Sequence, residues 1–306
     1  MLDDYKKLWK IIANHSYITI CTHIEPDGDT LGSAVALKEL IRINCPKVKE
    51  VKISGGDYPR NLLFLIDEPI NLVENEYFNK SLKIVVDTST KSRIYDSRVI
   101  PEQSLKIDHH PHENKWLFEI GGDNWPATGE LLTLIIKALK LKTNGKVLNG
   151  LAVAIITDTE FFMERNINQE TFKCMGFLME KGLNYSQLIK NMKLNNLENK
   201  LIFDTIKDKQ EYEGISYVIS DSVITNDIVR PLVMKFVDST TSEVAIAFLK
   251  KDDGKYRGEI RSKTHFDVSQ VARKFGGGGH HNSSGFIIDN INDVQKVLDY
   301  TKSVLI

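Results

Sequence analysis

Apolar and polar positions in the first half of the chain follow two different periods, and their alternation predicts the fold. Residues 5–14 and 31–43 repeat apolar side chains at helical spacing, and a third helix is predicted at about 128–139. Short apolar runs rich in β-branched residues lie between and after these helices. The runs predict buried strands at 17–22, 51–54, 82–86, 105–107 and 151–156. Because strands alternate with helices, we expect an α/β fold with a mostly parallel sheet flanked by helices on both faces.

The second half of the chain predicts a smaller domain that is also α/β. From about 185 to 209 the sequence is polar with helical spacing, and we interpret it as a connector. Strands are predicted at 215–220, 244–250 and 256–262, and a helix near 268–274. The predicted organisation is an N-terminal domain at 1–188, a helical linker at 189–211 and a second domain at 212–306.

The composition narrows the class of protein. With 306 residues, 42% of them hydrophobic and 26% charged, the chain is long enough for two globular domains. A formal net charge of −1 argues against a protein that coats long nucleic acid, but it is compatible with a small anionic ligand. The three cysteines show no paired spacing. We find no secretory leader and no apolar run of membrane-spanning length, and we expect a cytoplasmic protein.

Four consecutive glycines followed by a histidine, at 276–280, form a candidate anion site. Glycine has no side chain, so its backbone N–H groups can approach a phosphate closely. His280 can donate to the same anion. This segment therefore predicts phosphate binding in the second domain.

In the first domain, side chains suited to metal binding follow four predicted strands. A single aspartate after a strand is usually a turn or helix cap, but four such strand ends in one domain are hard to explain as caps. Ligands of an open parallel sheet bind beyond the carboxyl ends of its strands. The residues are His23, Asp27 and Asp29 after the first strand, Asp87 after another, Asp108, His109 and His110 after a third, and Asp158 after the last.

The charges of these side chains indicate two divalent cations. Four carboxylates carry four negative charges, which two such cations would neutralise, and without them mutual repulsion and burial would be unfavourable. Imidazole and carboxylate donors without thiolate favour Mn²⁺ or Mg²⁺ over structural zinc. The carboxylates counted are Asp27, Asp29, Asp87 and Asp158.

These residues resemble the successive motifs of the DHH phosphoesterase superfamily, and the C-terminal motifs resemble its DHHA1 domain. The resemblance covers nearly the whole chain and implies an N-terminal DHH domain followed by a smaller DHHA1 domain. A two-domain chain of this kind is similar to the nanoRNase/pAp-phosphatase branch. The DHH motifs are His23-x3-Asp27-x-Asp29, Val86-Asp87-Thr88, Asp108-His109-His110-Pro111 and Thr157-Asp158-Thr159. The DHHA1 motifs are Arg261-Ser262, Gly276 to His280, and Ser284-Gly285.

The resemblance assigns a role to each matching residue. It implies one metal on His23, Asp27 and Asp87, and a second on Asp29, Asp87, His109 and Asp158, with Asp87 bridging. His110 would face the substrate phosphate, and Asp108 would orient the metal-binding imidazoles from behind. The implied catalytic residues are His110, Asp108 and Arg261, and the implied binders of a terminal phosphate are Arg261, Gly277, Gly278, Gly279, His280 and Ser284.

The function that the resemblance implies is metal-dependent phosphoester hydrolysis through a water activated by two cations, for which we expect Mn²⁺ with Mg²⁺ as the alternative. Expected substrates are short oligoribonucleotides, degraded to mononucleotides, and 3′-phosphoadenosine 5′-phosphate (pAp), converted to AMP. We expect no long nucleic acid and no membrane as partners, and a homodimer is compatible with the sequence. Two alternatives stay open: hydrolysis of cyclic di-AMP or pApA, and a catalytically silent nucleotide-binding protein. Glu160 stands where the family usually has glycine, which favours the second alternative.

Overall fold

Five parallel strands form the sheet of the first unit in the computed structural model, which describes residues 1–88, 90–163 and 167–305. Their order is β2-β1-β3-β4-β5, so the chain moves outward from β1 in both directions. The mostly parallel sheet predicted from the sequence is confirmed. The strands are β1 (Tyr17–Cys21), β2 (Glu50–Ser54), β3 (Leu82–Val86), β4 (Ser104–Asp108) and β5 (Phe118–Gly121).

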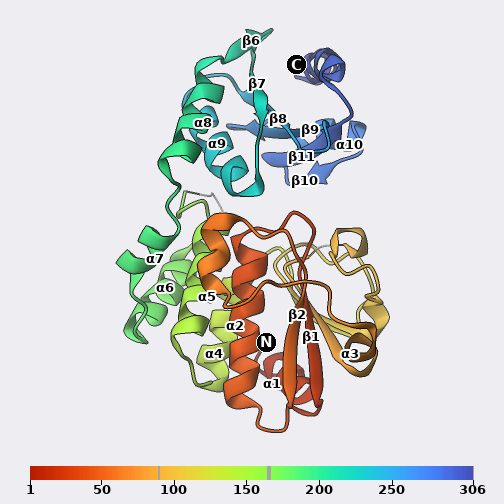
Figure 1. Cartoon of the computed structure of the whole chain (residues 1–306), viewed down its shortest axis with the longest axis vertical. Helices are drawn as coiled ribbons and strands as arrows, with labels where there is room; N and C mark the ends of the chain where they lie inside the picture. The colour runs from red at the N-terminus through yellow and green to blue at the C-terminus, as the bar shows by residue number, and fades with distance from the viewer. Residues whose placement is uncertain (89, 164–166, 306) are drawn as a thin grey trace. The chain divides into compact units, whose positions relative to one another are not determined.

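Most helices of this unit lie on one side of the sheet, where α2 and α4 pack on the strands and the largest hydrophobic core lies (Figure 1). These helices are α1 (Leu2–Ala13), α2 (Gly28–Asn44), α4 (Thr128–Leu139), α5 (Gly145–Asp158), α6 (Gln169–Glu180) and α7 (Tyr185–Asn191). The opposite face is covered by α3 (Asn75–Lys80) and by loops that contribute Val99 and Trp116 to a smaller core. Three 3-10 turns complete the unit, at Arg60–Leu65, Lys91–Arg93 and Pro101–Gln103.

One predicted strand is wrong. Residues 151–156 lie inside α5 and not in the sheet. The run is apolar at every position because α5 is buried among other helices, and a short apolar run does not distinguish a buried helix from a buried strand. Gly32 of α2 and Gly150 of α5 allow the two helices to approach closely, since a Cβ on Gly32 would overlap the carbonyl oxygen of Gly150.

A mixed six-stranded sheet forms the second unit, in the order β10-β11-β9-β8-β7-β6. Only β7 and β8 pair in parallel. Helices α8 (Asn196–Lys207) and α9 (Asn226–Asp238) pack on one face, and α10 (Ser269–Lys274) and α11 (Val294–Val304) pack on the other. A 3-10 turn at Ile291–Asp293 precedes α11. The strands are β6 (Gln210–Tyr212), β7 (Ile215–Val223), β8 (Val244–Lys250), β9 (Tyr256–Ser262), β10 (Gly278–Gly279) and β11 (Ser283–Ile288).

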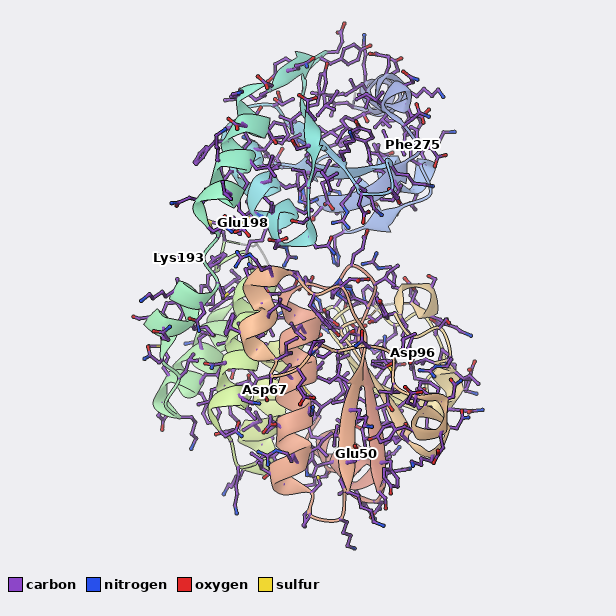
Figure 2. All side chains as sticks on the ribbon, viewed as in Figure 1. Glu50, Asp67, Asp96, Lys193, Glu198 and Phe275 are labelled. Carbon is purple, nitrogen blue, oxygen red and sulfur yellow. The ribbon has the colours of Figure 1, made fainter. Side chains whose placement is uncertain are left out.

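The division between the units falls at Lys193, which Figure 2 labels together with Glu198 in the first turn of α8. The expected linker at 189–211 includes α8. Its residues Leu201, Ile202 and Ile206 belong to the core that α9 forms with the second sheet, so α8 packs as part of the second unit. Among the described residues, we find no helix long and apolar enough to cross a membrane.

Candidate metal centre

The carboxyl ends of β1, β3 and β4 place most of the predicted metal-binding residues together. His23 follows β1 by two residues, Asp87 directly follows β3, and His109 directly follows β4. Asp27 is the N-cap of α2, where its carboxylate accepts the N–H groups of Asp29 and Thr30. The sequence therefore placed these side chains correctly at one edge of a parallel sheet.

Asp158 lies in the same cluster but is positioned by a helix and not by a strand. It was predicted after a strand, but it is the last residue of α5. A carboxylate is unfavourable at a helix C-terminus because the helix dipole is negative there. Its Oδ2 lies 3.1 Å from Nε2 of His109, so the position puts a fourth carboxylate into the cluster.

The first donor group consists of His23, Asp27 and Asp87, whose ligand atoms lie within 4.8 Å of one another. Nε2 of His23 is 3.6 Å from Asp27 and 3.5 Å from Asp87. The other ring nitrogen, Nδ1, lies 2.8 Å from the carbonyl oxygen of Ile24, to which it can donate. In the neutral ring, this bond would select the tautomer whose lone pair is on Nε2, as in metal-binding histidines.

The second donor group consists of Asp29, His109 and Asp158. Nε2 of His109 lies 3.9 Å from Asp29 and 3.4 Å from Oδ1 of Asp87. Its Nδ1 is 3.1 Å from the carbonyl oxygen of Trp125, so a backbone carbonyl orients this ring as well. Asp87 lies near a histidine of each group through different oxygens, Oδ2 toward His23 and Oδ1 toward His109.

Asp29 has a second role that the sequence does not reveal. Helix α4 has no side-chain cap at Ala127. Instead the Asp29 carboxylate accepts the N–H groups of Thr128 at 2.7 Å and Gly129 at 3.0 Å. Ser33 also donates to it at 3.1 Å. Asp29 is therefore fixed by the start of α4, whose N–H groups stabilise its negative charge.

The pKa shifts in the cluster indicate that its carboxylates are stabilised by added positive charge. Burial raises the pKa of Asp29 well above its ordinary value, and the carboxylates of Asp87 and Asp158 raise it further. Burial alone would lower the pKa of His23, but Asp27 and Asp87 outweigh it and raise that pKa to about 10. In the metal-free protein, protonated imidazoles thus supply the charge that divalent cations would supply. The donor set of carboxylates and oriented imidazoles fits two such cations.

Cation binding should therefore release protons. The folded pKa of His23 is raised above its unfolded value, so the ring is protonated at pH 7.5 and a cation must displace that proton. Affinity is expected to increase with pH up to about 10, and the stability that the protonated ring gives the metal-free protein is lost as pH rises through the same value. Titration calorimetry with Mn²⁺ in two buffers of different ionisation enthalpy should show roughly one to two protons released per chain. Release of none would contradict this charge state.

His110 forms a third donor group with Asp87 and His109, whose ligand atoms also lie within 4.8 Å of one another, and it is bonded to Asp108. Oδ1 of Asp108 is 2.7 Å from Nδ1 of His110. Asp108 was expected behind the metal-binding imidazoles. In the structure Asp108 is bonded to His110, while the Trp125 carbonyl lies against His109, so the role of Asp108 behind the imidazoles stays a prediction. Burial acts to raise the pKa of Asp108, but His110 and Lys106 outweigh it and lower the pKa below its ordinary value.

In the second unit, Arg261 lies on β9 beside the strand that follows the glycine run. Its Nη1 donates to the carbonyl oxygens of Ile260 and Ser284, and it lies 3.2 Å from the Glu259 carboxylate. The hydroxyl of Ser284 donates to the carbonyl oxygen of His280 at 2.8 Å. Four of the predicted phosphate-binding residues, Arg261, Gly279, His280 and Ser284, are therefore neighbours in the fold.

The glycine run is not a bare loop of unused amides, and this part of the expectation needs correction. The N–H of Gly277 donates to the carbonyl oxygen of Ala272 at the end of α10, at 2.8 Å. A Cβ on Gly277 would overlap the carbonyl oxygen of Gly285, so this glycine allows two backbones to pack closely. Gly278 and Gly279 form the short strand β10, paired with β11. In this conformation Gly277 has no N–H to offer a phosphate.

Two family models match the chain in this order. The DHH family, N-terminal domain, matches residues 17–156, and the DHHA1 domain matches residues 214–306. Together they account for about three quarters of the sequence. The chain belongs to the DHH/DHHA1 phosphoesterase superfamily. The parallel sheet with its donor groups is the DHH domain, and the mixed sheet with Arg261 and the glycine run is the DHHA1 domain.

Relatives of known name align with both domains. A protein of Streptococcus mutans named probable bifunctional oligoribonuclease and PAP phosphatase NrnA is 28% identical over 98% of this chain and 99% of its own length. The bifunctional oligoribonuclease and PAP phosphatase NrnA of Bacillus subtilis is 27% identical over 95% and 96%. The crystal structure of an exopolyphosphatase-related protein from Bacteroides fragilis superposes with a TM-score of 0.83 at 17% identity, covering 100% of this chain and 98% of that one. This last likeness shows that the two chains share a fold.

Glu160, the departure from the family pattern, begins a turn of left-handed backbone. Glu160, Phe161 and Phe162 have φ values of 47°, 56° and 66°. Non-glycine residues adopt this region at an energetic cost, and such residues cluster at functional sites. The turn is closed by the N–H of Phe161 donating to the carbonyl oxygen of Ile156 at 2.8 Å. Asp158 lies 3.1 Å from His109 with Glu160 present, and every predicted metal ligand belongs to one of the two donor groups.

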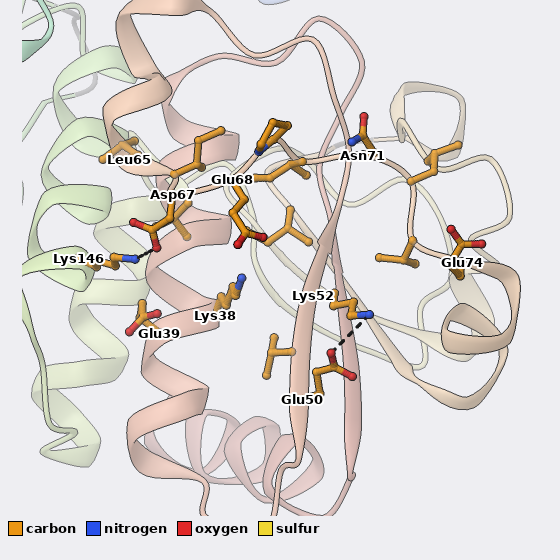
Figure 3. A pocket seen from close by; sticks show the side chains of 18 residues that line it. Lys38, Glu39, Glu50, Lys52, Leu65, Asp67, Glu68, Asn71, Glu74 and Lys146 are labelled. Atoms are coloured by element: carbon orange, nitrogen blue, oxygen red, sulfur yellow. Dashed lines mark hydrogen bonds and ion pairs between the residues drawn. The ribbon is translucent and has the colours of Figure 1, made fainter.

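A separate charged pocket lies elsewhere in the DHH domain, along strand β2 (Figure 3). Its volume is about 560 Å³, and its wall includes Lys38, Glu68 and Lys146. Lys146 forms an ion pair with Asp67, and Lys52 lies 3.4 Å from Glu50. Among the described residues that line it, none is a predicted site residue. The metal centre is therefore distinct from this pocket.

Proposed function

We propose that this protein is a phosphohydrolase that degrades short oligoribonucleotides to mononucleotides and converts pAp to AMP. The observation that carries the proposal is a pair of adjacent donor groups, with Asp87 in contact with a histidine of each. Two adjacent cations suit phosphoester hydrolysis because they act on both the attacking and the leaving oxygen. The names of the Streptococcus mutans and Bacillus subtilis relatives support this pair of substrates.

We propose Mn²⁺ as the cation in both positions, with Mg²⁺ as the alternative, because the donors are oxygen and imidazole nitrogen without thiolate. When bound, such cations supply a water of lowered pKa and neutralise charge on the phosphoryl group. The residues that would hold them are His23, Asp27 and Asp87 for one, and Asp29, Asp87, His109 and Asp158 for the other.

The remaining residues would act on the substrate directly. Asp108 fixes one edge of the His110 ring, and we assign to His110 a contact with a phosphoryl oxygen. In the DHHA1 domain, Arg261, His280, Ser284 and the amides of Gly278 and Gly279 would hold a terminal phosphate. Charge-assisted bonds from Arg261 would dominate that binding.

The net charge of −1 supports small nucleotide substrates over long nucleic acid. We propose a cytoplasmic enzyme because the Streptococcus mutans and Bacillus subtilis relatives are named for nucleotide-processing activities. A homodimer stays a prediction, which sedimentation of the purified chain would test.

The test is a product profile with purified, metal-stripped protein. The protein is supplied with Mn²⁺, Mg²⁺ or EDTA and is given pAp, a 5′-labelled ribodinucleotide, pApA and cyclic di-AMP in parallel. We expect cation-dependent release of AMP from pAp and of mononucleotides from the linear substrates. Strong preference for cyclic di-AMP would instead indicate a role in signalling. Tight nucleotide binding without turnover under any cation would indicate the silent binding protein.

A further inference from the structure

Lys106 is a buried lysine in the middle of a sheet strand. Its side chain is only 1% exposed, and its neighbours on β4, Leu105 and Ile107, are fully buried apolar residues. Strands of a parallel sheet that is covered on both faces are ordinarily apolar throughout, and lysine is almost never fully buried unless it is paired. A lysine at this position therefore needs an explanation.

The pairing of the strands explains where the lysine points. Lys106 and Asp108 are two residues apart on β4, so their side chains lie on the same face of the sheet. Glu119 on β5 is the registered partner of Lys106. Nζ of Lys106 lies 3.1 Å from Oδ2 of Asp108 and 3.5 Å from Glu119, with the ring centroid of Trp116 at 5.6 Å. The ammonium group is thus held between two carboxylates.

The two oxygens of Asp108 have different partners. Oδ2 accepts from Lys106, while Oδ1 lies 2.7 Å from Nδ1 of His110. The carboxylate cannot rotate without weakening one of these bonds. The backbone of Asp108 is also fixed, because its carbonyl oxygen accepts the N–H of Gly122 at 3.0 Å. A continuous line of polar contacts therefore runs from Lys106 through Asp108 to His110.

We propose that Lys106 is a positioning residue for catalysis, which holds Asp108 in the rotamer that orients His110. The inference rests on the proposed function, because His110 matters only if the DHH domain performs hydrolysis. A purely structural reading would make Lys106 and Asp108 an ion pair that stabilises the sheet. Removal of the lysine would then reduce the amount of folded protein without changing how each folded molecule turns over.

A double-mutant cycle separates the two readings. The variants are Lys106→Met, which keeps the length and removes the charge, Asp108→Asn, and the two combined. Turnover is expressed per metal-loaded molecule, which corrects for any loss of folded protein. Lys83→Met is the matched control, because Lys83 lies on the neighbouring strand β3 and donates to the carbonyl oxygens of Phe78 and Ser81.

We expect Lys106→Met to lower kcat about 10- to 100-fold with KM for pAp little changed, because small misplacements of a catalytic group reduce rates to this extent. Asp108→Asn should lower kcat about 100-fold, and adding Lys106→Met to it should change kcat by less than about twofold, since the lysine acts only through Asp108. Lys83→Met should match the wild type.

The inference is overturned if Lys106→Met keeps the wild-type kcat, or if the two losses multiply in the double variant. If Lys106→Met does not fold, Lys106→Gln, which retains an N–H donor, takes its place in the same cycle. A wild-type protein that turns over none of the substrates would refute the proposed function itself, and the inference would fall with it. An active wild type with multiplicative losses would refute the inference alone.

Discussion

Asp87→Asn should lower kcat for pAp by on the order of 10³-fold or more, because a divalent cation contributes several kcal/mol of charge stabilisation to the transition state. Asp87 is the one described carboxylate that contacts both His23 and His109. Asparagine has nearly the same shape but carries no negative charge, so both cation sites should weaken together. The effect should exceed that of losing Asp27 or Asp158, each of which belongs to one donor group.

The measurement is kcat together with thermal unfolding, each over a range of Mn²⁺ concentrations. A cation that binds only the folded state raises Tm by mass action, so the wild type should be stabilised by Mn²⁺ and Asp87→Asn should not. Asp57→Asn is the control, because Asp57 is exposed and its carboxylate accepts from the Tyr95 hydroxyl outside the donor groups. An Asp87→Asn variant that kept both turnover and the Mn²⁺-dependent rise in Tm would refute the shared-carboxylate assignment.

The sequence was sufficient for strands β1 to β4 of the DHH domain because each is a short apolar run bounded by polar residues. It failed for residues 151–156, which lie in α5. Because α5 is buried against α2, it has no polar face. The alternation of apolar and polar residues that marks an amphipathic helix is therefore absent from this segment. The edge strand β5 was also missed, since Phe118–Gly121 is only four residues long.

The clustering of the candidate metal ligands could be predicted because each lies in a short motif, and a parallel sheet brings the ends of its strands together. The groups that hold these residues in place could not be predicted. The groups that orient Asp29 and His109 are backbone atoms of Thr128, Gly129 and Trp125, which carry no signal in side-chain chemistry. Lys106 did carry a signal, as a charged residue inside an apolar strand run.

The glycine run shows another limit of prediction from the sequence. Glycines between a helix and a strand indicate close backbone approach, but they do not say what approaches. At Gly277 the approaching group is the chain itself, at Gly285 of β11. The contact with Gly285 follows from the pairing of β10 with β11. That pairing is set by tertiary structure, so the sequence of the glycine run does not reveal it.

His110→Asn should lower kcat about 10³-fold, within the range observed when a positioned acid–base or electrostatic side chain is removed. The side-chain amide of asparagine can place its nitrogen where Nδ1 of histidine lies, so the bond to Asp108 is retained. The variant loses the edge of the ring that carries Nε2, which we propose contacts the phosphoryl group. The variant therefore removes the proposed substrate contact and leaves Asp108 with a hydrogen-bond donor.

The matched control is His112→Asn. His112 is half-exposed, two residues further along the chain, and its Nδ1 likewise bonds a carboxylate, Glu119, at 2.7 Å. We expect both variants to bind Mn²⁺ as the wild type does, because the groups of His23 with Asp27 and of His109 with Asp158 stay intact, although His110 also forms a group with Asp87 and His109. His110→Asn with kcat within tenfold of wild type would remove His110 from the chemistry. Loss of Mn²⁺ binding in the same variant would instead make His110 a ligand, since its Nδ1 lies only 3.7 Å from Asp87.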